Sequence, residues 1–382
     1  MPNRSQSDRI KRAAAAAGFD LAGIAAVSGG PWRELEVFRQ WIEAGHAGEM
    51  EYLKSRDEQG RLKRAAIAHV APWARSVVVC AINYNAAAPY STECTNPERG
   101  WISRYAWGGS ERPADYHDTV LLRLLRVEAE LQQMVREAGQ TSPQTCCYVD
   151  TGPVVERVLA RHAGVGWIGK NTCVIHPRLG SWLFLGVILC SLELEPDLPA
   201  PDRCGTCTRC LDACPTNALP APYQLDATRC ISYLTIEKRG SIPEELRESM
   251  GRHIFGCDIC QDVCPWNRRA PASAEPEFQP RPELVNPALE WLAGMREEEF
   301  RKVFRHSALR RTRFSGVRRN VAVALGNSGW ERFRPLLEKM EQDADPVVAE
   351  HARWALARLP GAGQSSAEVG AAPQAQPEAI TS

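Results

Sequence analysis

Hydrophobic residues follow two different periods along the first half of the chain. Short apolar runs at residues 75–84, 145–149, 173–175 and 182–189 have the length and composition of strands. Apolar residues are spaced as on one face of a helix at residues 7–18, 117–138 and 153–163. Residues 1–195 are therefore predicted to form a mixed α/β domain.

The pattern after residue 284 is helical throughout. Helices are predicted at residues 314–325 and 331–341, separated by a turn at residues 326–329. A third helix is predicted to begin at Asp345-Pro346 and to end at Leu359. This arrangement is typical of one HEAT-like repeat, which buries a core only by packing on neighbouring structure.

Two proline-rich stretches, residues 195–202 and 270–283, are predicted to be linkers. They divide the chain into an α/β domain at 1–195, a cysteine-rich domain at 196–270 and a helical domain at 284–360. The small and polar residues 361–382 are expected to be disordered.

Length and charge narrow the possible functions. The 382 residues are enough for two or three domains with an ample core. The formal net charge is zero, so contact with a nucleic acid requires a local basic patch. The longest apolar run, residues 181–192, is too short to cross a bilayer, and Asp20 interrupts the apolar N-terminal stretch. A soluble protein without a membrane partner is expected.

The strongest chemical signal is the spacing of eight cysteines. One run has the C-x₂-C-x₂-C-x₃-C-P spacing of bacterial ferredoxins, whose fourth cysteine ligates the other of two clusters. The second run lacks its first cysteine, and Cys230 is the only thiol between the runs. One predicted ligand set is Cys204, Cys207, Cys210 and Cys264; the other is Cys214, Cys230, Cys257 and Cys260.

A pair of structural zinc sites is the alternative, since C-x₂-C pairs also bind zinc. Two C-x₃-C-P endings favour iron–sulfur clusters instead. Cluster thiolates need a reducing compartment, which indicates the cytoplasm.

Three loops of the α/β half hold candidate binding residues. Residues 102–109 and 115–117 form either an ordinary connection or a lid over a large cofactor. Asp150 is either a helix cap, with Pro153 near the first turn, or a general acid at a strand end. The glycines of residues 164–172 let the backbone approach a ligand, but their spacing matches neither a P-loop nor a dinucleotide motif.

Residues 301–319 hold eight arginines or lysines and no acidic residue, with phenylalanines between them. Solvated helix faces usually mix charges of both signs. The segment therefore favours a phosphate-binding surface.

Taken together, these motifs resemble the epoxyqueuosine reductase family, cobalamin-dependent enzymes of tRNA modification. The matching stretches include Ile102-Ser-Arg-Tyr-Ala, Asp115-Tyr-His117, Asp150-Thr-Gly-Pro-Val, Gly166-Trp-Ile-Gly-Lys170, Gly180-Ser-Trp and the cysteine framework. The resemblance implies three parts: an α/β corrinoid-binding domain of the nitroreductase-like type, a ferredoxin-like domain with two 4Fe-4S clusters, and a HEAT-like helical domain that binds tRNA.

The resemblance also implies a reaction. Epoxyqueuosine at the wobble position of tRNA is reduced to queuosine, with two electrons and release of water. The electrons pass from an external donor through the clusters to cobalt, which reaches Co(I), and Asp150 donates the proton. The apolar residues before Asp150 predict a raised pKa for its carboxyl group.

The resemblance implies a set of cobalamin-contacting residues, namely Arg61, Arg104, Tyr105, Tyr116, His117, Asp150, Lys170, Asn171, Thr172 and Ser181. Contacts to tRNA are expected from Arg310, Arg311, Arg313, Arg318 and Arg319. A monomer is expected.

Two departures from the family pattern bear on these expectations. The loop after residue 108 is expanded by residues 109–113. Val120 stands where cobalt-ligating corrinoid motifs of the form Asp-x-His-x-x-Gly have glycine, so base-off cobalamin without His117 as a ligand is expected. Two alternatives are a reductive dehalogenase, which usually carries a twin-arginine signal, and a plain electron carrier, which leaves most of the chain unexplained.

Overall fold

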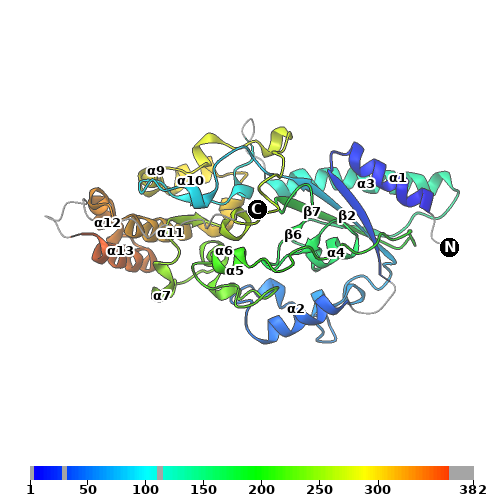
Figure 1. Ribbon diagram of the computed structural model, residues 1–382, viewed down its shortest axis with the longest axis horizontal. Coiled ribbons are helices and arrows are strands. Elements are labelled where there is room, and N and C mark those ends of the chain that lie inside the picture. The colour runs from blue at the N-terminus through cyan, green and yellow to red at the C-terminus, as the bar shows by residue number, and fades with distance from the viewer. Residues whose placement is uncertain (1–3, 28–31, 110–114, 361–382) are drawn as a thin grey trace, which may run out of the picture.

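Four antiparallel strands form the sheet of the N-terminal half (Figure 1). The computed structural model describes residues 4–27, 32–109 and 115–360. The order β1-β2-β7-β4 corresponds to Leu21–Ala26, Ser76–Asn83, Leu183–Cys190 and Thr145–Tyr148. The strands predicted at residues 75–84, 145–149 and 182–189 are confirmed. The pattern misses β1, whose sequence Leu-Ala-Gly-Ile-Ala-Ala holds a single β-branched residue.

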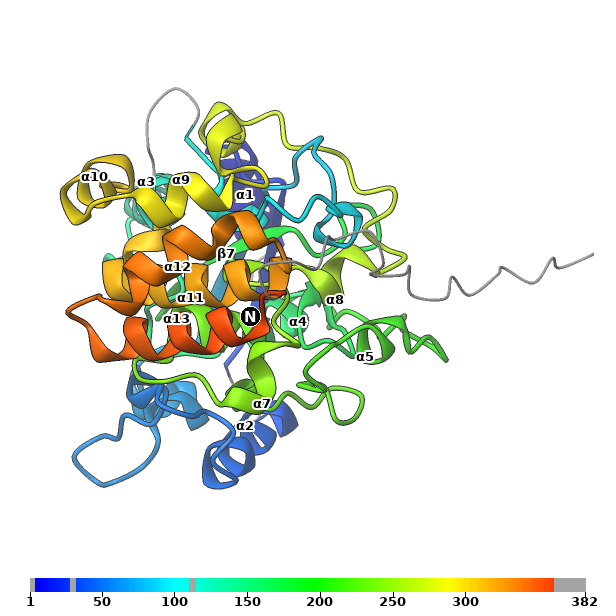
Figure 2. The ribbon, with the colours of Figure 1, turned by 90° about the vertical axis from the view of Figure 1, so that its left-hand side faces the viewer.

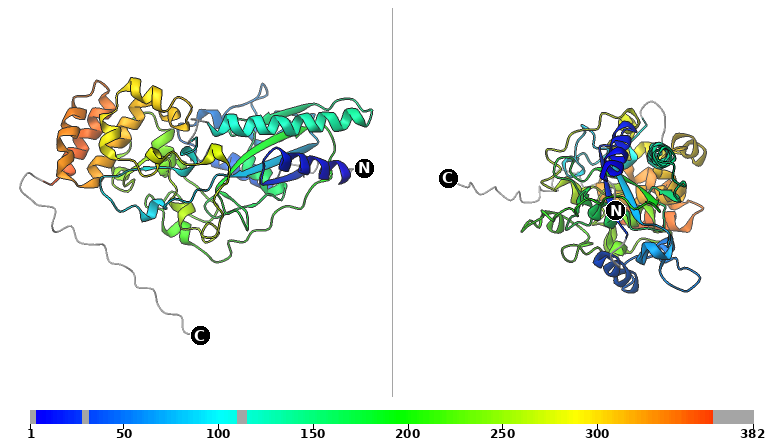
Figure 3. Two further views of the ribbon diagram at one scale, coloured as in Figure 1. Left: turned by 90° about the horizontal axis from the view of Figure 1, so that it is seen from above. Right: turned by 90° about the vertical axis from the view of Figure 1, so that its right-hand side faces the viewer.

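Helices cover both faces of this sheet. Every residue of β2 is buried, because α1 (Arg4–Ala16) and α3 (Tyr116–Glu137) pack on one face and α4 (Glu156–His162) on the other. Figure 3 shows α1 and α3 on the same side of the sheet. The helices predicted at residues 7–18 and 117–138 are confirmed, and the third begins at Glu156 rather than Pro153.

The cysteine-bearing segment lies between the sheet and the C-terminal helices (Figure 1). It holds four short helices: α5 (Arg209–Asp212), α6 (Ile231–Ile236), α7 (Glu244–Arg247) and α8 (Ile259–Asp262). One small sheet joins it to the N-terminal half, and a second lies within that half. Strand β8 (His253–Phe255) pairs in parallel with β3 (Trp101–Ile102), and β5 (Trp167–Ile168) forms a hairpin with β6 (Val174–Ile175), the strand predicted at 173–175.

The C-terminal part is helical, as predicted. Its helices are α9 (Leu289–Gly294), α10 (Glu297–Val303), α11 (Arg313–Ser328), α12 (Arg334–Glu341) and α13 (Pro346–Arg358). Helices α11, α12 and α13 lie side by side (Figure 2). The side chain of Asp345 accepts a hydrogen bond from the Val347 amide and so caps α13, as the Asp-Pro pair predicts.

The turn predicted at residues 326–329 is wrong, because α11 continues to Ser328. A β-carbon at Gly326 would lie 2.8 Å from the Ala355 α-carbon, so this glycine permits the close approach of α13. The helix ends at Gly329, which has φ of +67° in the left-handed region.

Two buried polar side chains of α11 fix the helical part on the cysteine-bearing segment. Arg319 is 1 % exposed and donates to the carbonyls of Leu234, Lys238 and Gly240. Asn320 donates to the carbonyls of Thr235 and Ile254. The C-terminal helices therefore pack on the body of the protein, as expected for a predicted single repeat.

The stretch at 270–283 is a fixed strap rather than a loose linker. Phe278 is buried in the core between the sheet and α3, and the side chain of Asn83 donates to the Pro271 carbonyl. In addition, Trp101, Ile102 and Trp107 belong to the same core as the C-terminal helices. One hydrophobic core thus contains residues from both sides of the predicted domain boundaries, and these boundaries stay predictions.

No helix within the described ranges is long and apolar enough to cross a membrane. The expectations for residues 110–113 of the expanded loop and for the 361–382 tail fall outside the described residues.

Candidate active site and cysteine ligand sets

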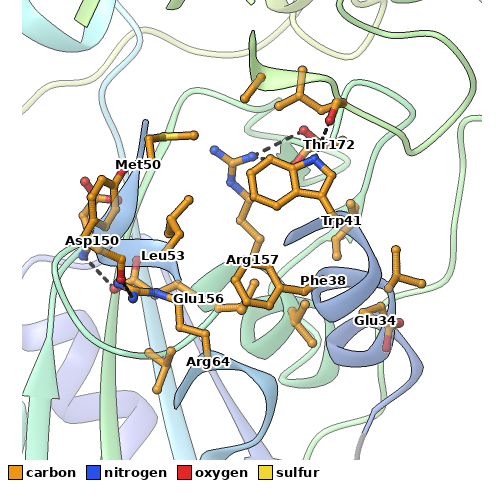
Figure 4. A pocket seen from close by; sticks show the side chains of 18 of the residues that line it. Glu34, Phe38, Trp41, Met50, Leu53, Arg64, Asp150, Glu156, Arg157 and Thr172 are labelled. Atoms are coloured by element: carbon orange, nitrogen blue, oxygen red, sulfur yellow. Dashed lines mark hydrogen bonds between the residues drawn. The ribbon is translucent and has the colours of Figure 1, made fainter. Parts of the chain in front are cut away.

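A cavity of about 1250 Å³ opens between α2 (Arg33–Glu43), the turn after β4 and the cysteine-bearing segment (Figure 4). One wall is apolar and includes Phe38, Trp41 and Leu53. Asp150 lies on the wall formed by the turn after β4, and Cys230 lies on the wall formed by the cysteine-bearing segment. The cavity therefore joins the candidate acid to one member of the second predicted ligand set.

Asp150 is held by residues at the start of α3. The Tyr116 hydroxyl donates to Asp150 Oδ2 at 3.0 Å, and His117 Nε2 lies 3.5 Å from the same oxygen. On the other side of the imidazole, His117 Nδ1 lies 2.6 Å from Asp115 Oδ1. Asp115 also caps α3 by accepting from the His117 amide, so one helix start organises the carboxylate.

The backbone of Asp150 has a conformation that non-glycine residues seldom adopt, with φ of +58°. Its amide donates to Glu156 Oε1 at 2.6 Å, which closes the turn between β4 and α4. Such strained positions cluster at functional sites. The helix-cap interpretation of Asp150 and Thr151 is wrong, because α4 begins at Glu156 after Val155 and neither side chain caps it.

The charges around Asp150 oppose the predicted raised pKa. Desolvation of the carboxylate raises its pKa, but His117, the Tyr116 hydrogen bond and the Arg157 charge together lower it by more, and the net pKa is below its ordinary value. Burial lowers the pKa of His117, yet Asp115 and Asp150 raise it to about 9. Burial and the Asp150 charge raise the pKa of Glu156 to about 8. The prediction of a raised pKa therefore applies to Glu156, and for Asp150 it is wrong.

Of the ten predicted cobalamin contacts, Asp150 and Thr172 line the cavity and the other eight do not. Arg104 is 2 % exposed, and its two terminal nitrogens donate to the carbonyls of Ala86, Ala88 and Pro89 inside the fold. Arg61 lies outside the cavity lining and pairs with Asp57 at 2.8 Å.

Tyr105 and Tyr116 pack behind Asp150. Their rings meet edge to face, and Tyr116 stacks on Phe184 of β7. This aromatic contact fixes the Tyr116 hydroxyl that donates to Asp150.

The β5–β6 loop serves mainly to join the two halves. The buried Lys170 ammonium donates to the carbonyls of Gly205 and Cys207, and Asn171 donates to the Cys260 carbonyl. Ser181 binds the cysteine-bearing segment too, through Asn267 and Gln261. Thr172, by contrast, lines the cavity.

The structure groups the first predicted ligand set. Its four cysteines line one small cavity of about 20 Å³, together with Lys170 and Asn171; they are Cys204, Cys207, Cys210 and Cys264. Cys264 joins the first run across the fold although 54 residues separate it from Cys210 in sequence. Four cysteines are the number of thiolate ligands that a 4Fe-4S cluster takes, although no three Cys, His, Asp or Glu side chains of the described residues lie close enough to hold a single metal ion. This ligand set stays a prediction.

The second set also comes together. Burial raises the pKa of the Cys257 thiol, and the neighbouring Cys230 and Cys214 raise it further. A hydrogen bond with Cys173 and burial raise the pKa of Cys260, and Cys257 and Cys230 add to this. Each of the four cysteines Cys214, Cys230, Cys257 and Cys260 is thus within electrostatic range of at least two of the others, which is consistent with the second predicted ligand set.

Comparison with known proteins decides the family. A model described as epoxyqueuosine reductase QueG matches residues 64–151, and one described as a 4Fe-4S double cluster binding domain matches residues 203–267. The epoxyqueuosine reductase of Xanthomonas campestris is 39% identical over 353 residues, which cover 92% of this chain and 95% of that protein. This chain belongs to the epoxyqueuosine reductase family.

Solved structures of this family have the same fold. One, with a tRNA-Tyr epoxyqueuosine-modified stem loop, has a TM-score of 0.80 at 31% identity and covers 93% of this chain and 90% of that chain. Another, from Bacillus subtilis, has its catalytic aspartate loop swung out of the active site, with a TM-score of 0.79, 31% identity and the same coverage. Membership of the epoxyqueuosine reductase family sets aside the zinc, dehalogenase and electron-carrier alternatives.

In this member of the epoxyqueuosine reductase family, fewer cations of the basic segment, residues 301–319, are available for phosphate than its sequence suggests. Arg319 is buried, and Arg318 pairs with Asp343 at 2.7 Å, so neither is available for tRNA as predicted. Arg311 lines the cavity and pairs with Glu237 at 2.5 Å. Arg310 and Arg313 are exposed, and the structure shows no ion pair for either among the described residues.

Several charged residues on the cavity wall are not among the predicted site residues, and they include Arg64, Glu156 and Arg157. The signal was available for Glu156, which stands six positions after Asp150 at the start of a helix and can reach back to its amide. Arg64 had no such signal, because its partners are backbone carbonyls of distant segments.

Proposed function

We propose that this protein reduces epoxyqueuosine to queuosine at the wobble position of tRNA. The observation that carries the proposal is the position of Asp150, a carboxylate on the wall of a cavity bordered by a predicted cluster ligand, in a member of this family. The reaction breaks both C–O bonds of the epoxide and forms a C=C bond. It consumes two electrons and two protons and releases one water.

Two 4Fe-4S clusters would be held by the two sets of four cysteines described above. When bound, such clusters accept and pass on single electrons from an external donor. The protein positions them through the β5–β6 loop, because Lys170 and Asn171 hold the backbone of both cysteine runs. These contacts fix where the clusters would lie relative to the cavity.

Cobalamin is proposed for the cavity. The volume of about 1250 Å³ suits a ligand much larger than an ordinary substrate, and the apolar wall of α2 suits a macrocycle. When bound, cobalamin supplies a strongly reducing cobalt centre. The base-off form without a histidine ligand is favoured, since both ring nitrogens of His117 already face carboxylates.

Asp150 is proposed to donate a proton to the epoxide oxygen. Its side chain is 60% exposed within the cavity, so it can reach a substrate there. Tyr116 and His117 hold the carboxylate from behind and set its direction. Opening of the first C–O bond leaves an alkoxide, which a carboxyl group within hydrogen-bond reach can protonate.

The tRNA is proposed to bind along the exposed cations of residues 301–313. The wobble nucleotide must leave its stack to enter the cavity, and phosphate contacts by Arg310 and Arg313 would hold the stem while it does so. Action on tRNA in the cytoplasm, as a monomer, remains part of the proposal.

The decisive experiment is nucleoside mass analysis. An epoxyqueuosine-containing anticodon stem-loop is incubated anaerobically with the cluster-loaded protein, cobalamin and a chemical reductant. Queuosine should appear with the wild-type protein and fall at least a hundredfold with Asp150→Asn, the lower range for loss of a general acid. Unchanged epoxyqueuosine with the wild-type protein would contradict the proposed function.

A further inference from the structure

The proposed reaction needs two protons in each turnover, whereas the surroundings of Asp150 hold its pKa below the ordinary value. At neutral pH Asp150 is therefore ionised and carries no proton of its own. A proton donor in this state requires a neighbouring group that supplies it with protons.

A chain of two side chains, Asp115 and His117, leads to Asp150 from the start of α3. Asp115 Oδ1 lies 2.6 Å from His117 Nδ1, and His117 Nε2 lies 3.5 Å from Asp150 Oδ2. His117 Nε2 is shielded from solvent, and the described residues offer it no other partner. The ring is stacked on Tyr116 with centroids 4.0 Å apart, which fixes its plane. Among the described residues, Asp150 is the one ion-pair partner of Nε2.

We propose that His117 is the proton source that recharges Asp150, with Asp115 holding the imidazole in place. The proposal rests on the proposed function and adds the route by which its protons arrive. Protonated His117 gives its Nε2 proton to the Asp150 carboxylate and becomes the neutral tautomer with a proton on Nδ1. Asp150 then passes that proton to the substrate oxygen.

The sequence of bonds balances over two such transfers. The first proton neutralises the alkoxide formed when one C–O bond breaks. The second accompanies the departing oxygen as water when the other C–O bond breaks and the C=C bond forms. The two electrons come from the external reductant through the clusters. Because His117 Nε2 is shielded from solvent, it regains each proton through Asp150, whose side chain is 60% exposed in the cavity and whose pKa lies below that of His117.

The other groups near the pair keep His117 charged. Against the effect of burial, the carboxylates of Asp115 and Asp150 stabilise the imidazolium and raise the pKa of His117 to about 9. Transfer to Asp150 alone is therefore uphill, and the alkoxide, a far stronger base, drives it by taking the proton from Asp150. Arg157 of α4 lowers the pKa of Asp150, while burial keeps the pKa of Tyr116 well above its ordinary value, so Tyr116 retains its proton and only orients the acid. Glu156 accepts from the Asp150 amide rather than facing the carboxylate.

The first test compares pH profiles of stem-loop reduction. The wild-type rate should stay level from pH 6 to pH 8.5 and fall above pH 9, as His117 loses its proton. The rate of His117→Gln should fall at least tenfold at pH 8, with a smaller deficit at pH 5.5, where solvent protonates Asp150 directly. Tyr116→Phe serves as the control for orientation alone and should keep the wild-type profile at a lower rate. A His117→Gln variant with the wild-type rate and profile would overturn the proposal.

The second test needs no turnover. Hydrogen–deuterium exchange at the imidazole Cε1, followed by peptide mass spectrometry of the cluster-loaded protein, gives the titration midpoint of each histidine. The midpoint of His117 should lie near 9 and should fall in Asp150→Asn. His351, whose pKa burial lowers to about 4, is the internal control without a midpoint in this range. A His117 midpoint near 6.5 that Asp150→Asn leaves unchanged would refute the proton source. Wild-type protein that fails to reduce the stem-loop but shows the high midpoint would instead refute only the proposed function.

Discussion

The buried guanidinium of Arg64 donates to the Gly152 carbonyl at 2.7 Å, two residues after Asp150. A second guanidinium nitrogen, Nη1, donates to the carbonyl of Tyr52, which lies on a different side of the cavity. One side chain thus ties the turn that carries the acid to the segment that faces it. Because Arg64 is 7% exposed, neither carbonyl can exchange it for water without local opening.

Arg64→Met should leave two carbonyls without their donor, lower the unfolding free energy by about 1–3 kcal/mol and free the Asp150 turn. Turnover should fall by more than stability alone explains. The matched control is Arg56→Met, an exposed arginine whose removal should cost less than about 0.5 kcal/mol. Thermal unfolding and turnover are measured for both variants; equal effects of the two would contradict the tie between Arg64 and the turn.

Cys230→Ala should remove a ligand of the second cluster. We expect iron content to fall toward half and the signal of one reduced cluster to disappear from electron paramagnetic resonance spectra. Cys94→Ala is the control, since Cys94 lies outside both ligand sets. Full iron occupancy in Cys230→Ala would mean that another thiol, of which Cys173 beside Cys260 is the nearest candidate, completes the set.

Glu156→Gln should change how stability depends on pH. The pKa of Glu156 is raised to about 8 in the folded protein, so the folded state binds the proton more tightly than the unfolded state. That contribution is complete below about pH 4.5 and is lost as the pH rises through 8. Glutamine keeps the acceptor for the Asp150 amide but cannot ionise.

The melting temperatures of Glu156→Gln and wild type should therefore agree at pH 5, and the variant should be higher by a few degrees at pH 8. Glu338→Gln, at an exposed site on α12, controls for removal of a charge. A constant difference from pH 5 to pH 8 would show that Glu156 titrates normally.

Replacing Arg310 and Arg313 with alanine should weaken stem-loop binding and flatten its salt dependence. Each lost phosphate contact reduces the slope of log K against log salt by about 0.9 on a duplex. The control, Lys339→Ala with Arg353→Ala, removes the same charge from exposed positions elsewhere on the helical part. If both double variants bind alike at every salt concentration, the tRNA contacts another surface. Leaving Arg311 in place preserves its pair with Glu237.

The sequence pattern correctly predicted those structural elements that depend on residues close together in the sequence. The strand at β2, the helix at α3 and the Asp345 cap depend on neighbouring residues, and all three are confirmed. The cysteine spacing even predicted that Cys264 joins the first run, because cluster ligation imposes that crossing.

Expectations failed where the deciding partner lies far away in sequence. The low pKa of Asp150 comes from His117, 33 positions earlier, and the apolar residues next to Asp150 do not reveal it. The basic segment looked uncompensated because Asp343 and Glu237 stand outside it. The sequence predicts that Arg319 is exposed, yet its side chain is buried and donates to three backbone carbonyls.

The strap at residues 270–283 and the tryptophans at 101 and 107 have a practical consequence for dissecting the chain. A fragment cut at residue 195 or 270 would lose partners for cores on both sides of the cut, because each half of the molecule completes the interior of the other. Neither the sheet nor the helices should be obtainable as an independent soluble piece. Heat or denaturant should accordingly melt the two ends in a single transition.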